Sequence, residues 1–382
     1  MTATLIFWSA VALTFYAWAG YPLLLLALAS MTNRTVAKKR VTPPVTFIIT
    51  AYNEEERVRA KIENTLAQDY PASRFEVIVA SDCSTDRTDD IAREYGGVRL
   101  VRAGERRGKE AAQQLALDAA SGEIVVFSDV ATALAPTAVS SIITNFADPT
   151  VGCVSSIDRF VDADGRVTGE GAYVRYEMWL RRLETRVYSV VGLSGSFFAA
   201  RRDVCRAWSA DRQSDFSTAL HAVDLGLRAV LDPETAGYYR NITDDRHEQD
   251  RKTRTVVRGL AVLARNRRML NPFRYGLFAW ELASHKLCRW LVPMAMIAAA
   301  AANLFLLSGS PVYAAAFGVQ IAFYAVAALG AWTGARALRI PSFLVRSHAA
   351  ILIAWCRFAC GERMTCWTPS QRLATLPQID PR

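Results

Sequence analysis

The chain has 382 residues, of which 52% are hydrophobic, and carries 45 Lys and Arg against 36 Asp and Glu, a net charge of +9. This composition excludes a disordered chain and indicates a membrane protein, because a soluble basic protein is less apolar on average. Seven cysteines with no CxxC pair and four scattered histidines argue against a disulfide scaffold and against a His-rich metal site.

The excess positive charge lies outside the middle of the chain. Residues 1–40 contain four bases and no acid, and residues 291–382 contain seven arginines and two acids. Residues 41–290 hold 34 bases and 34 acids and are therefore neutral. A nucleic-acid-binding protein concentrates basic charge on its folded domain, so this distribution argues against nucleic acid as a partner.

The first expected element is a transmembrane helix within residues 1–33, which contain no charge. Its apolar run, Leu5–Ala29, exceeds the roughly 20 residues that cross a bilayer core of ~30 Å. A cleaved signal peptide is the alternative, but the run is too long and no basic segment precedes it. Residues 34–44 follow as a basic linker, which the positive-inside rule places in the cytoplasm.

From residue 45 onward, β-branched apolar runs alternate with helical patterns. The expected strands are 45–52, 75–81, 98–101 and 123–128, and the expected helices are 56–68, 86–95 and 109–119. Strands this hydrophobic are buried on both faces, which predicts an α/β domain with a mostly parallel sheet over residues 45–245. Ligands of such sheets bind beyond the carboxyl ends of the strands.

Acidic residues follow three of these strands, in Asn53–Glu55, at Asp82 and Asp86, and at Asp129. Each acid is a potential helix N-cap, and we expect that role for Asp86. Carboxylates that converge on one sheet edge also hold a hard divalent cation, which neutralises a diphosphate. No GxGxxG follows the first strand, and Gly104–Glu110 is too short for a P-loop, so we interpret it as a basic loop near a phosphate or at a helix start.

The C-terminal part of the chain is again apolar and basic. Residues 246–290 have the pattern of amphipathic interfacial helices. Residues 291–335 are free of charge, and a turn signal at 308–311 divides them into a transmembrane hairpin. In 336–382, the uncharged segment between Arg346 and Arg357 is too short to cross, which predicts an interfacial helix and a tail. The arginines after the hairpin leave the central domain in the cytoplasm of a multi-pass plasma (inner) membrane protein.

Several segments, taken in order, resemble the GT-A catalytic domain of glycosyltransferase family 2, and the membrane segments resemble its polysaccharide-synthase branch. The segments are Thr50–Glu55, Ser81–Asp86, Phe127–Asp129, Gly195–Arg202, Ser214–Asp215 and Arg251–Lys252. The resemblance covers essentially the whole chain. It implies a Rossmann-like GT-A domain with transmembrane helices at both ends.

The resemblance also implies roles for individual residues. Contacts with the uracil and ribose of a UDP-sugar are expected from Ala51, Tyr52, Asn53, Glu54 and Asp82. Asp129 is expected to ligate Mg²⁺ or Mn²⁺, and Asp215 to be the base that deprotonates the acceptor, with inversion at the anomeric carbon. The cations expected at the leaving diphosphate are Arg251, Lys252 and Arg254, with Lys109 and Arg107 as weaker candidates. The alternative for the first three is a basic helix face on anionic headgroups.

Three departures from the family pattern affect the expected activity. The usual Asp-x-Asp reads Asp129-Val130-Ala131, so one metal carboxylate is missing. The usual Glu-Asp reads Ser214-Asp215, which keeps the base. Gln-x-x-Arg-Trp is replaced at 248–252 by a segment without Trp, which argues against processive synthesis. The aromatic helix expected at 171–188 lines the acceptor site in the family, although packing on the sheet explains its pattern equally well.

We therefore expect a membrane-bound inverting glycosyltransferase that moves a sugar from a UDP-sugar to a saccharide or lipid-linked acceptor in cell-surface or exopolysaccharide synthesis. Its expected partners are membrane lipids and polysaccharide-export or synthase proteins. The alternative is a catalytically silent family member that binds a sugar nucleotide or scaffolds a partner synthase, because the second acid is absent at Ala131. A transporter is not expected, since the three predicted spans contain no ionisable residue.

Overall fold

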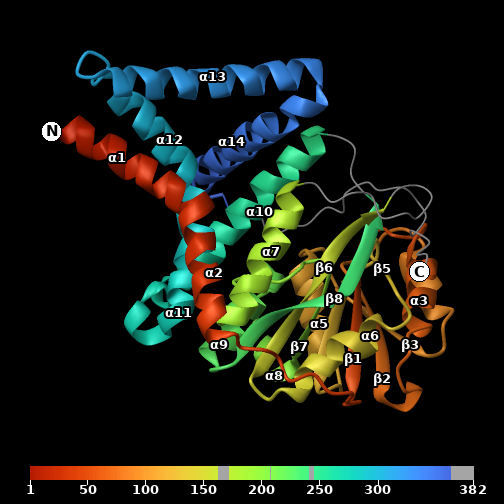
Figure 1. Ribbon diagram of the computed structural model, residues 1–382. Coiled ribbons are helices and arrows are strands. Elements are labelled where there is room, and N and C mark those ends of the chain that lie inside the picture. Colours follow the sequence, from red (N-terminus) through yellow and green to blue (C-terminus); the bar gives the residue numbers. More distant parts are fainter. Residues whose placement is uncertain (162–171, 207, 241–244, 363–382) are drawn as a thin grey trace. The chain divides into compact units, whose positions relative to one another are not determined.

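A computed structural model describes residues 1–161, 172–206, 208–240 and 245–362 (Figure 1). Its contacts divide the chain into two units. Residues 28–243 with 262–266 form what we call the sheet unit, and residues 1–27, 244–261 and 267–363 form the helical unit. The part of the expected C-terminal tail beyond residue 362 lies outside the described residues.

The sheet unit contains one eight-stranded sheet in the order β3-β2-β1-β4-β7-β6-β8-β5 (Figure 1). The strands are β1 Val45–Ala51, β2 Phe75–Ser81, β3 Val98–Arg102, β4 Ile124–Asp129, β5 Ala133–Leu134, β6 Val151–Val161, β7 Phe197–Arg201 and β8 Arg228–Arg240. Strands β3, β2, β1 and β4 run parallel, whereas β7 pairs antiparallel with both β4 and β6. The sheet is therefore mixed and mostly parallel on the β1 side, as expected.

Helices cover both faces of the sheet. They are α3 Val58–Leu66, α4 Thr88–Arg93, α5 Lys109–Ala119, α6 Ala138–Ile143, α7 Ala172–Val187, α8 Arg202–Cys205 and α9 Ser214–Asp224. The central strand β1 sends Phe47 and Ile49 into a core shared with α3, α4 and α6. It sends Ile48 into a second core, shared with α5, α7, α8 and α9. Burial on both faces explains the continuous hydrophobic pattern of this strand.

The four strands expected from the sequence are present, and each boundary lies within one residue of its expected position. Helix α5 has the expected bounds, whereas α3 and α4 begin and end two residues inside theirs. Helix ends depend on side-chain caps and on hydrogen bonds from neighbouring loops, which periodicity does not report. The aromatic helix expected at 171–188 is α7.

The helical unit contains most of the long apolar helices. Its elements are α1 Thr2–Phe15, a π-helical turn Tyr16–Gly20, α2 Tyr21–Thr32, α10 Asp245–Arg265, α11 Pro272–Leu282, a π-helical turn Ala283–Cys288, α12 Arg289–Leu304, α13 Pro311–Thr333 and α14 Arg339–Ala359, with α2 and α10 ending in the sheet unit. Three continuous helices are long and apolar enough to cross a membrane: Thr2–Thr32, Pro272–Leu304 and Pro311–Thr333. Among the described helices α14 does not meet this criterion, and its assignment as an interfacial helix stays a prediction.

The second of these helices differs from the sequence expectation. It continues from Pro272 to Leu304 through a kink at Gly276, so the expected boundary at residue 290 falls inside it. It therefore includes the buried side chains of Glu281, His285 and Arg289, which the expected span left out. Arg289 stacks on Trp18 at 4.9 Å from the ring centroid. Packing of the guanidinium on this aromatic ring of the first helix explains how Arg289 is accommodated.

Candidate active site

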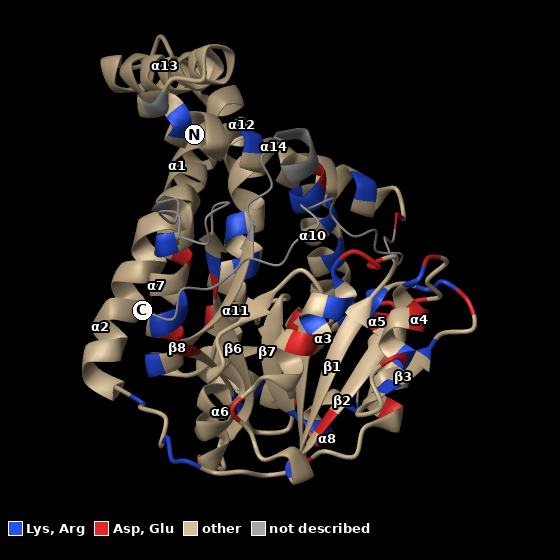
Figure 2. Cartoon of the chain, turned by 90° about the vertical axis from the view of Figure 1, so that its right-hand side faces the viewer, with Lys and Arg blue, Asp and Glu red and all other residues tan. Residues whose placement is uncertain are grey.

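The strand register brings the acidic segments to one edge of the sheet. Ala51 at the end of β1 pairs with Ser81 of β2, and Thr50 pairs with Asp129 at the end of β4. The residues that follow β1 and β2 therefore emerge next to Asp129. Figure 2 shows acidic and basic residues gathered at the end of the sheet where α4 and α5 begin.

Side-chain hydrogen bonds join the loops after β1 and β2. The Asn53 carboxamide oxygen accepts the Thr85 N–H at 2.8 Å, and the Glu54 N–H is donated to Thr88 Oγ1 at 2.7 Å. Asn53 and Cys83 have φ values of 51° and 59°, in the left-handed region. Non-glycine residues occupy this region at a cost and persist where the surroundings fix them, which is common at functional sites.

Asp86 binds the first turn of α4 from one residue before the N-cap position, which is Arg87. Its Oδ1 accepts the N–H of Thr88, the first residue of α4, at 3.0 Å, and also the Thr88 hydroxyl at 2.6 Å. Its Oδ2 accepts the Glu55 N–H at 3.0 Å. Asp86 is therefore a structural residue that connects the first two loops.

Asp82 holds the basic loop that precedes α5. The carboxylate is fully buried and accepts the N–H groups of Arg107 and Gly108 at 2.9–3.0 Å. Gly108 has a φ of 102°, which favours glycine, and Lys109 then begins α5. The Gly104–Glu110 segment is thus a loop at a helix start, which is one of the two interpretations that the sequence allowed. Through this loop, Asp82 sets the position of Lys109.

Lys109 binds the expected metal ligand, Asp129, and the backbone of Gly195, which lies beside the expected base. Its Nζ is 2.5 Å from Asp129 Oδ1 and 2.9 Å from the carbonyl oxygen of Gly195. A Cβ on Gly195 would lie 2.9 Å from Asp215 Oδ2, so the absence of a side chain at this position admits the Asp215 carboxylate. The structure therefore brings Lys109, Asp129 and Asp215 together around one glycine.

The local fold fixes both carboxylates of this group. Asp215 is the second residue of α9, and its Oδ1 accepts the Phe216 N–H at 2.8 Å. A helix N-terminus favours a negative charge at that position. The Asp129 N–H is donated to the carbonyl oxygen of Ser196 at 3.0 Å. The backbone of Asp129 is therefore fixed to Ser196, and the carboxylate of Asp215 is fixed to the start of α9.

Two further residues near this edge were missed in the sequence. Lys61 of α3 is fully buried, and its Nζ donates to Ser128 Oγ at 2.8 Å and to the Thr132 carbonyl at 2.6 Å. Asp158 of β6 accepts the hydroxyl groups of Ser194 and Ser196. A signal for Lys61 was present, because it lies one helical turn after Val58 and one helical turn before Thr65, which α3 also buries.

Burial also shifts the pKa of two ionisable groups at this edge. Burial raises the pKa of Glu54 to about 7, and its ion pair with Arg57, at 2.6 Å, opposes the shift. Burial lowers the pKa of Lys61 to about 7, and the charge of Asp129 opposes that shift. Perturbed carboxyl and amino groups at the carboxyl end of a parallel sheet are typical of a functional site.

Lys61 is expected to make stability depend on pH. Its folded-state pKa of about 7 lies below the ordinary value of 10.5, so between these values the unfolded chain holds a proton that the folded chain has lost. Stability therefore rises with pH in this window, by at most about 1.4 kcal/mol per pH unit. As the pH rises above 7, the thermal midpoint of the wild type should increase relative to that of Lys61→Met. Parallel pH profiles would contradict this expectation.

The three arginine and lysine candidates on α10 belong to the helical unit, whereas Asp129 and Asp215 belong to the sheet unit. Within the helical unit, the Lys252 Nζ lies 3.8 Å from the Phe343 ring centroid and 3.3 Å from Ser347 Oγ, both on α14. This contact favours a role for Lys252 in holding two basic helices together. The role expected for Arg251, Lys252 and Arg254 at the leaving diphosphate stays a prediction.

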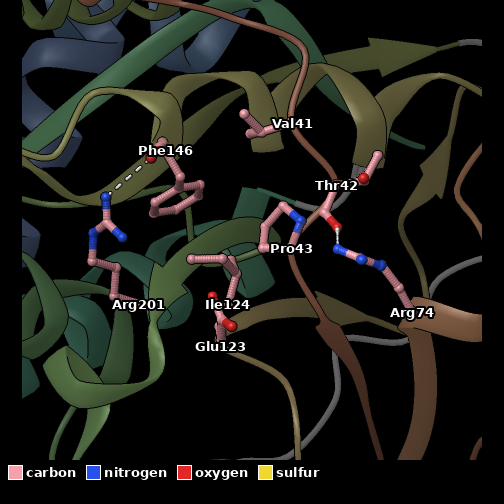
Figure 3. Close-up of a pocket in the computed structure, with 8 residues that line it drawn as sticks. All are labelled: Val41, Thr42, Pro43, Arg74, Glu123, Ile124, Phe146 and Arg201. Atoms are coloured by element: carbon pink, nitrogen blue, oxygen red, sulfur yellow. Dashed lines mark hydrogen bonds between the residues drawn. The ribbon is translucent and has the colours of Figure 1, made fainter.

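A separate pocket of about 280 Å³ lies at the opposite end of the central strands (Figure 3). It is lined by Val41, Thr42, Pro43, Arg74, Glu123, Ile124, Phe146 and Arg201. Its two guanidinium groups donate to main-chain carbonyls, Arg74 to Thr42 and Arg201 to Phe146. Because Pro43 and Ile124 precede or begin strands, this pocket is distinct from the site at the strands' carboxyl ends.

The mixed sheet, the acidic residues that follow β1, β2 and β4, and the position of Asp129, Lys109 and Asp215 near Gly195 are those of a GT-A-like domain. Residues 46–208 match the model of glycosyl transferase family 2. Residues 46–208 are therefore similar to the family that the sequence resembles, and the fold is the one expected from that resemblance.

Solved and curated proteins are similar to this chain over different lengths. The mannosyltransferase PcManGT from Pyrobaculum calidifontis, solved with GDP-Man and Mn²⁺, has a TM-score of 0.72 and 26% identity and covers 94% of this chain and 99% of its own. Glycosyltransferase AglE of Haloferax volcanii is 34% identical over 23% of this chain and 30% of its own. Beta-monoglucosyldiacylglycerol synthase of Nostoc sp. is 25% identical over 50% of this chain and 42% of its own. The chain thus spans less than half of these two curated relatives.

Proposed function

We propose that this protein is a membrane-bound inverting glycosyltransferase that transfers a sugar from a nucleoside diphosphate sugar to a saccharide or lipid-linked acceptor. The observation that carries the proposal is the meeting of Asp129, Lys109 and Asp215 around Gly195 at the carboxyl end of the parallel strands. A family 2 domain and the similarity to a mannosyltransferase over nearly the whole chain support it.

Asp215 is suited to act as the general base. A sugar hydroxyl is a poor nucleophile, and a carboxylate within hydrogen-bond reach accepts its proton while the new glycosidic bond forms. The acceptor oxygen attacks the anomeric carbon from the face opposite the leaving nucleoside diphosphate, and this single displacement inverts the configuration. The Lys109 ammonium supplies positive charge for the departing diphosphate, and Asp82 keeps its loop in place.

Asp129 is suited to hold Mg²⁺ or Mn²⁺. Its carboxylate supplies hard oxygen ligands and is about one-quarter exposed at the sheet edge. The described residues contain no group of three or more His, Cys, Asp or Glu placed to hold a metal, which fits a cation bound by few protein ligands and completed by donor phosphates. Such a cation neutralises charge on the leaving diphosphate. The Mn²⁺ in the PcManGT complex supports this assignment.

We propose a UDP-sugar as the donor, because the segments after β1 and β2 resemble a uridine-binding site. In this segment the Tyr52 ring stacks with the Arg106 guanidinium at 3.9 Å from the ring centroid, so an aromatic ring and a cation lie together after β1. GDP-mannose is the second candidate donor. The observation in its favour is the similarity to PcManGT over 94% of this chain.

We further propose that the three apolar helices anchor the protein in the plasma (inner) membrane with the catalytic domain in the cytoplasm, where nucleotide sugars occur. The basic residues after the first and third helices support this orientation. The proposed pathway is cell-surface or exopolysaccharide synthesis, with membrane lipids and export or synthase proteins as partners. The lipid product in the name of the Nostoc relative supports a lipid acceptor.

Purified membranes containing the protein, incubated with Mn²⁺ and a panel of UDP-sugars and GDP-mannose, test this proposal. We expect acceptor-dependent release of nucleoside diphosphate from one donor of the panel. The anomeric configuration of the product, determined by NMR, tests inversion. Donor binding without release from any donor would support the silent scaffold for which Ala131 argues.

A further inference from the structure

A buried lysine, Lys61, binds both ends of the turn that carries Asp129. Lys61 Nζ donates to Ser128 Oγ at 2.8 Å and to the Thr132 carbonyl oxygen at 2.6 Å. These two acceptors lie directly before and after the segment Asp129–Ala131. One amino group therefore binds both ends of the segment in which the second metal carboxylate is replaced by alanine.

Other contacts show that this turn is closely fitted. Within it, the Thr132 N–H is donated to the Asp129 carbonyl at 3.1 Å, and the Asp129 N–H is donated to Ser196 at 3.0 Å. A Cβ on Gly237 of β8 would lie 2.9 Å from Thr132 Cγ2. The backbone of Asp129 is thus fixed from the side of β7 and β8, and Lys61 fixes it from the side of α3.

Stability alone does not explain a lysine at this position. Its side chain is fully buried beside the Phe47 ring, whose centroid lies 5.4 Å from Nζ. Taking an ammonium group out of water costs several kcal/mol, and apolar residues of similar volume often replace buried charges without loss of stability. Its bonds to the Ser128–Thr132 turn are the feature that an apolar side chain would not reproduce.

We propose that Lys61 is a positioning residue that orients the Asp129–Thr132 turn so that Asp129, without a second carboxylate at 131, holds the donor-bound metal. This inference rests on the proposed function. Among the described ion pairs Lys61 makes none with Asp129, so it acts on the carboxylate through the backbone. A carboxylate held in one orientation loses less entropy on binding a cation than a mobile one.

Lys61→Met, of similar length and without the ammonium, tests the inference. Mn²⁺ binding to the full-length protein is measured by the loss of the free Mn²⁺ EPR signal, in one series with UDP and in another with GDP. We expect the dissociation constant for Mn²⁺ to rise about tenfold, the effect of losing about 1.4 kcal/mol, with folding verified by circular dichroism. Ser128→Ala removes one of the two bonds and keeps the lysine, and we expect a smaller rise in the same direction.

Asn64→Ala is the matched control on the same helix. Asn64 donates to the Leu134 carbonyl at 2.8 Å and accepts the Leu134 N–H at 3.0 Å, so it joins α3 to the strand β5 just beyond the clamped turn. We expect this variant to lose thermal stability and to keep its Mn²⁺ affinity. If Asn64→Ala weakens Mn²⁺ binding as much as Lys61→Met does, the effect of Lys61 is general loosening, and the inference is wrong.

Different results would contradict the role of Lys61 and the proposed function. Unchanged Mn²⁺ affinity in Lys61→Met, beside nucleotide-dependent Mn²⁺ binding by the wild type, would overturn the role of Lys61 and leave the proposed function standing. A wild-type protein that binds no Mn²⁺ with either nucleotide would overturn the metal site of the proposed function, and this inference with it.

Discussion

Asp215→Asn is expected to lower the rate of sugar transfer by about 10²–10⁴-fold and to leave donor binding unchanged, because general base catalysis contributes about that factor. Asparagine has nearly the same shape, and its carboxamide oxygen can still accept the Phe216 N–H that Asp215 Oδ1 accepts at 2.8 Å. The fit against Gly195 is also kept. The variant therefore removes the proton acceptor and, besides it, the bond that Gln213 Nε2 donates to Asp215 Oδ2 at 3.3 Å. Nucleoside diphosphate release and donor affinity, measured on the same preparation, check this expectation.

Asp203→Asn is the control for the charge change. Asp203 lies on α8 of the same unit, is exposed, and pairs at the surface with Arg206 at 3.1 Å, a contact of small energetic value. We expect it to retain wild-type activity. Equal release of nucleotide by the wild type and Asp215→Asn would show that another group accepts the proton, or that the measured release does not come from transfer to the acceptor.

The parallel half of the sheet was predictable because its strands are buried on both faces. Runs such as Val45–Ala51 have a single interpretation as a buried strand, and the rule that ligands bind at the strands' carboxyl ends then selects Asp82 and Asp129. The antiparallel half was not predicted. Strand β6 includes Ser155, Ser156 and Asp158, whose hydroxyl and carboxylate groups are satisfied by distant partners, and such tertiary pairing leaves no local pattern.

The chemistry of the site was partly predictable for a related reason. The reaction requires carboxylates such as those of Asp129 and Asp215. Their neighbourhoods meet at Gly195, and no spacing rule in the sequence connects Gly195 with both residues. Lysine in an amphipathic helix normally points to solvent, so Lys61 was passed over although it falls on the buried face of α3. The nucleotide role expected for Asp82 stays a prediction, since in the structure its carboxylate binds the loop before Lys109.

Asp129→Ala is expected to abolish metal-dependent donor binding and to reduce transfer by about 10²-fold or more, because the cation and its ligand stabilise the charge of the leaving diphosphate. In the wild type the Lys109 ammonium lies 2.5 Å from Asp129 and also binds the Gly195 carbonyl. The second bond holds the lysine when the carboxylate is removed, so the variant should fold. Calorimetric titration of the donor with Mn²⁺, and again after addition of EDTA, measures the loss.

Because Ala131 replaces the second acid, the protein is either an enzyme or a binding protein. The EDTA experiment distinguishes these two classes of function. Since a single carboxylate and the donor phosphates suffice for Mg²⁺ or Mn²⁺, an enzyme should lose activity both with EDTA and in Asp129→Ala. Asp118→Asn on α5, an exposed carboxylate near Gln114, is the control and should retain activity. If transfer survives both EDTA and Asp129→Ala, Lys109 alone stabilises the charge of the leaving diphosphate. Full donor affinity without transfer in the wild type would instead identify a binding protein that kept the fold after losing the second acid.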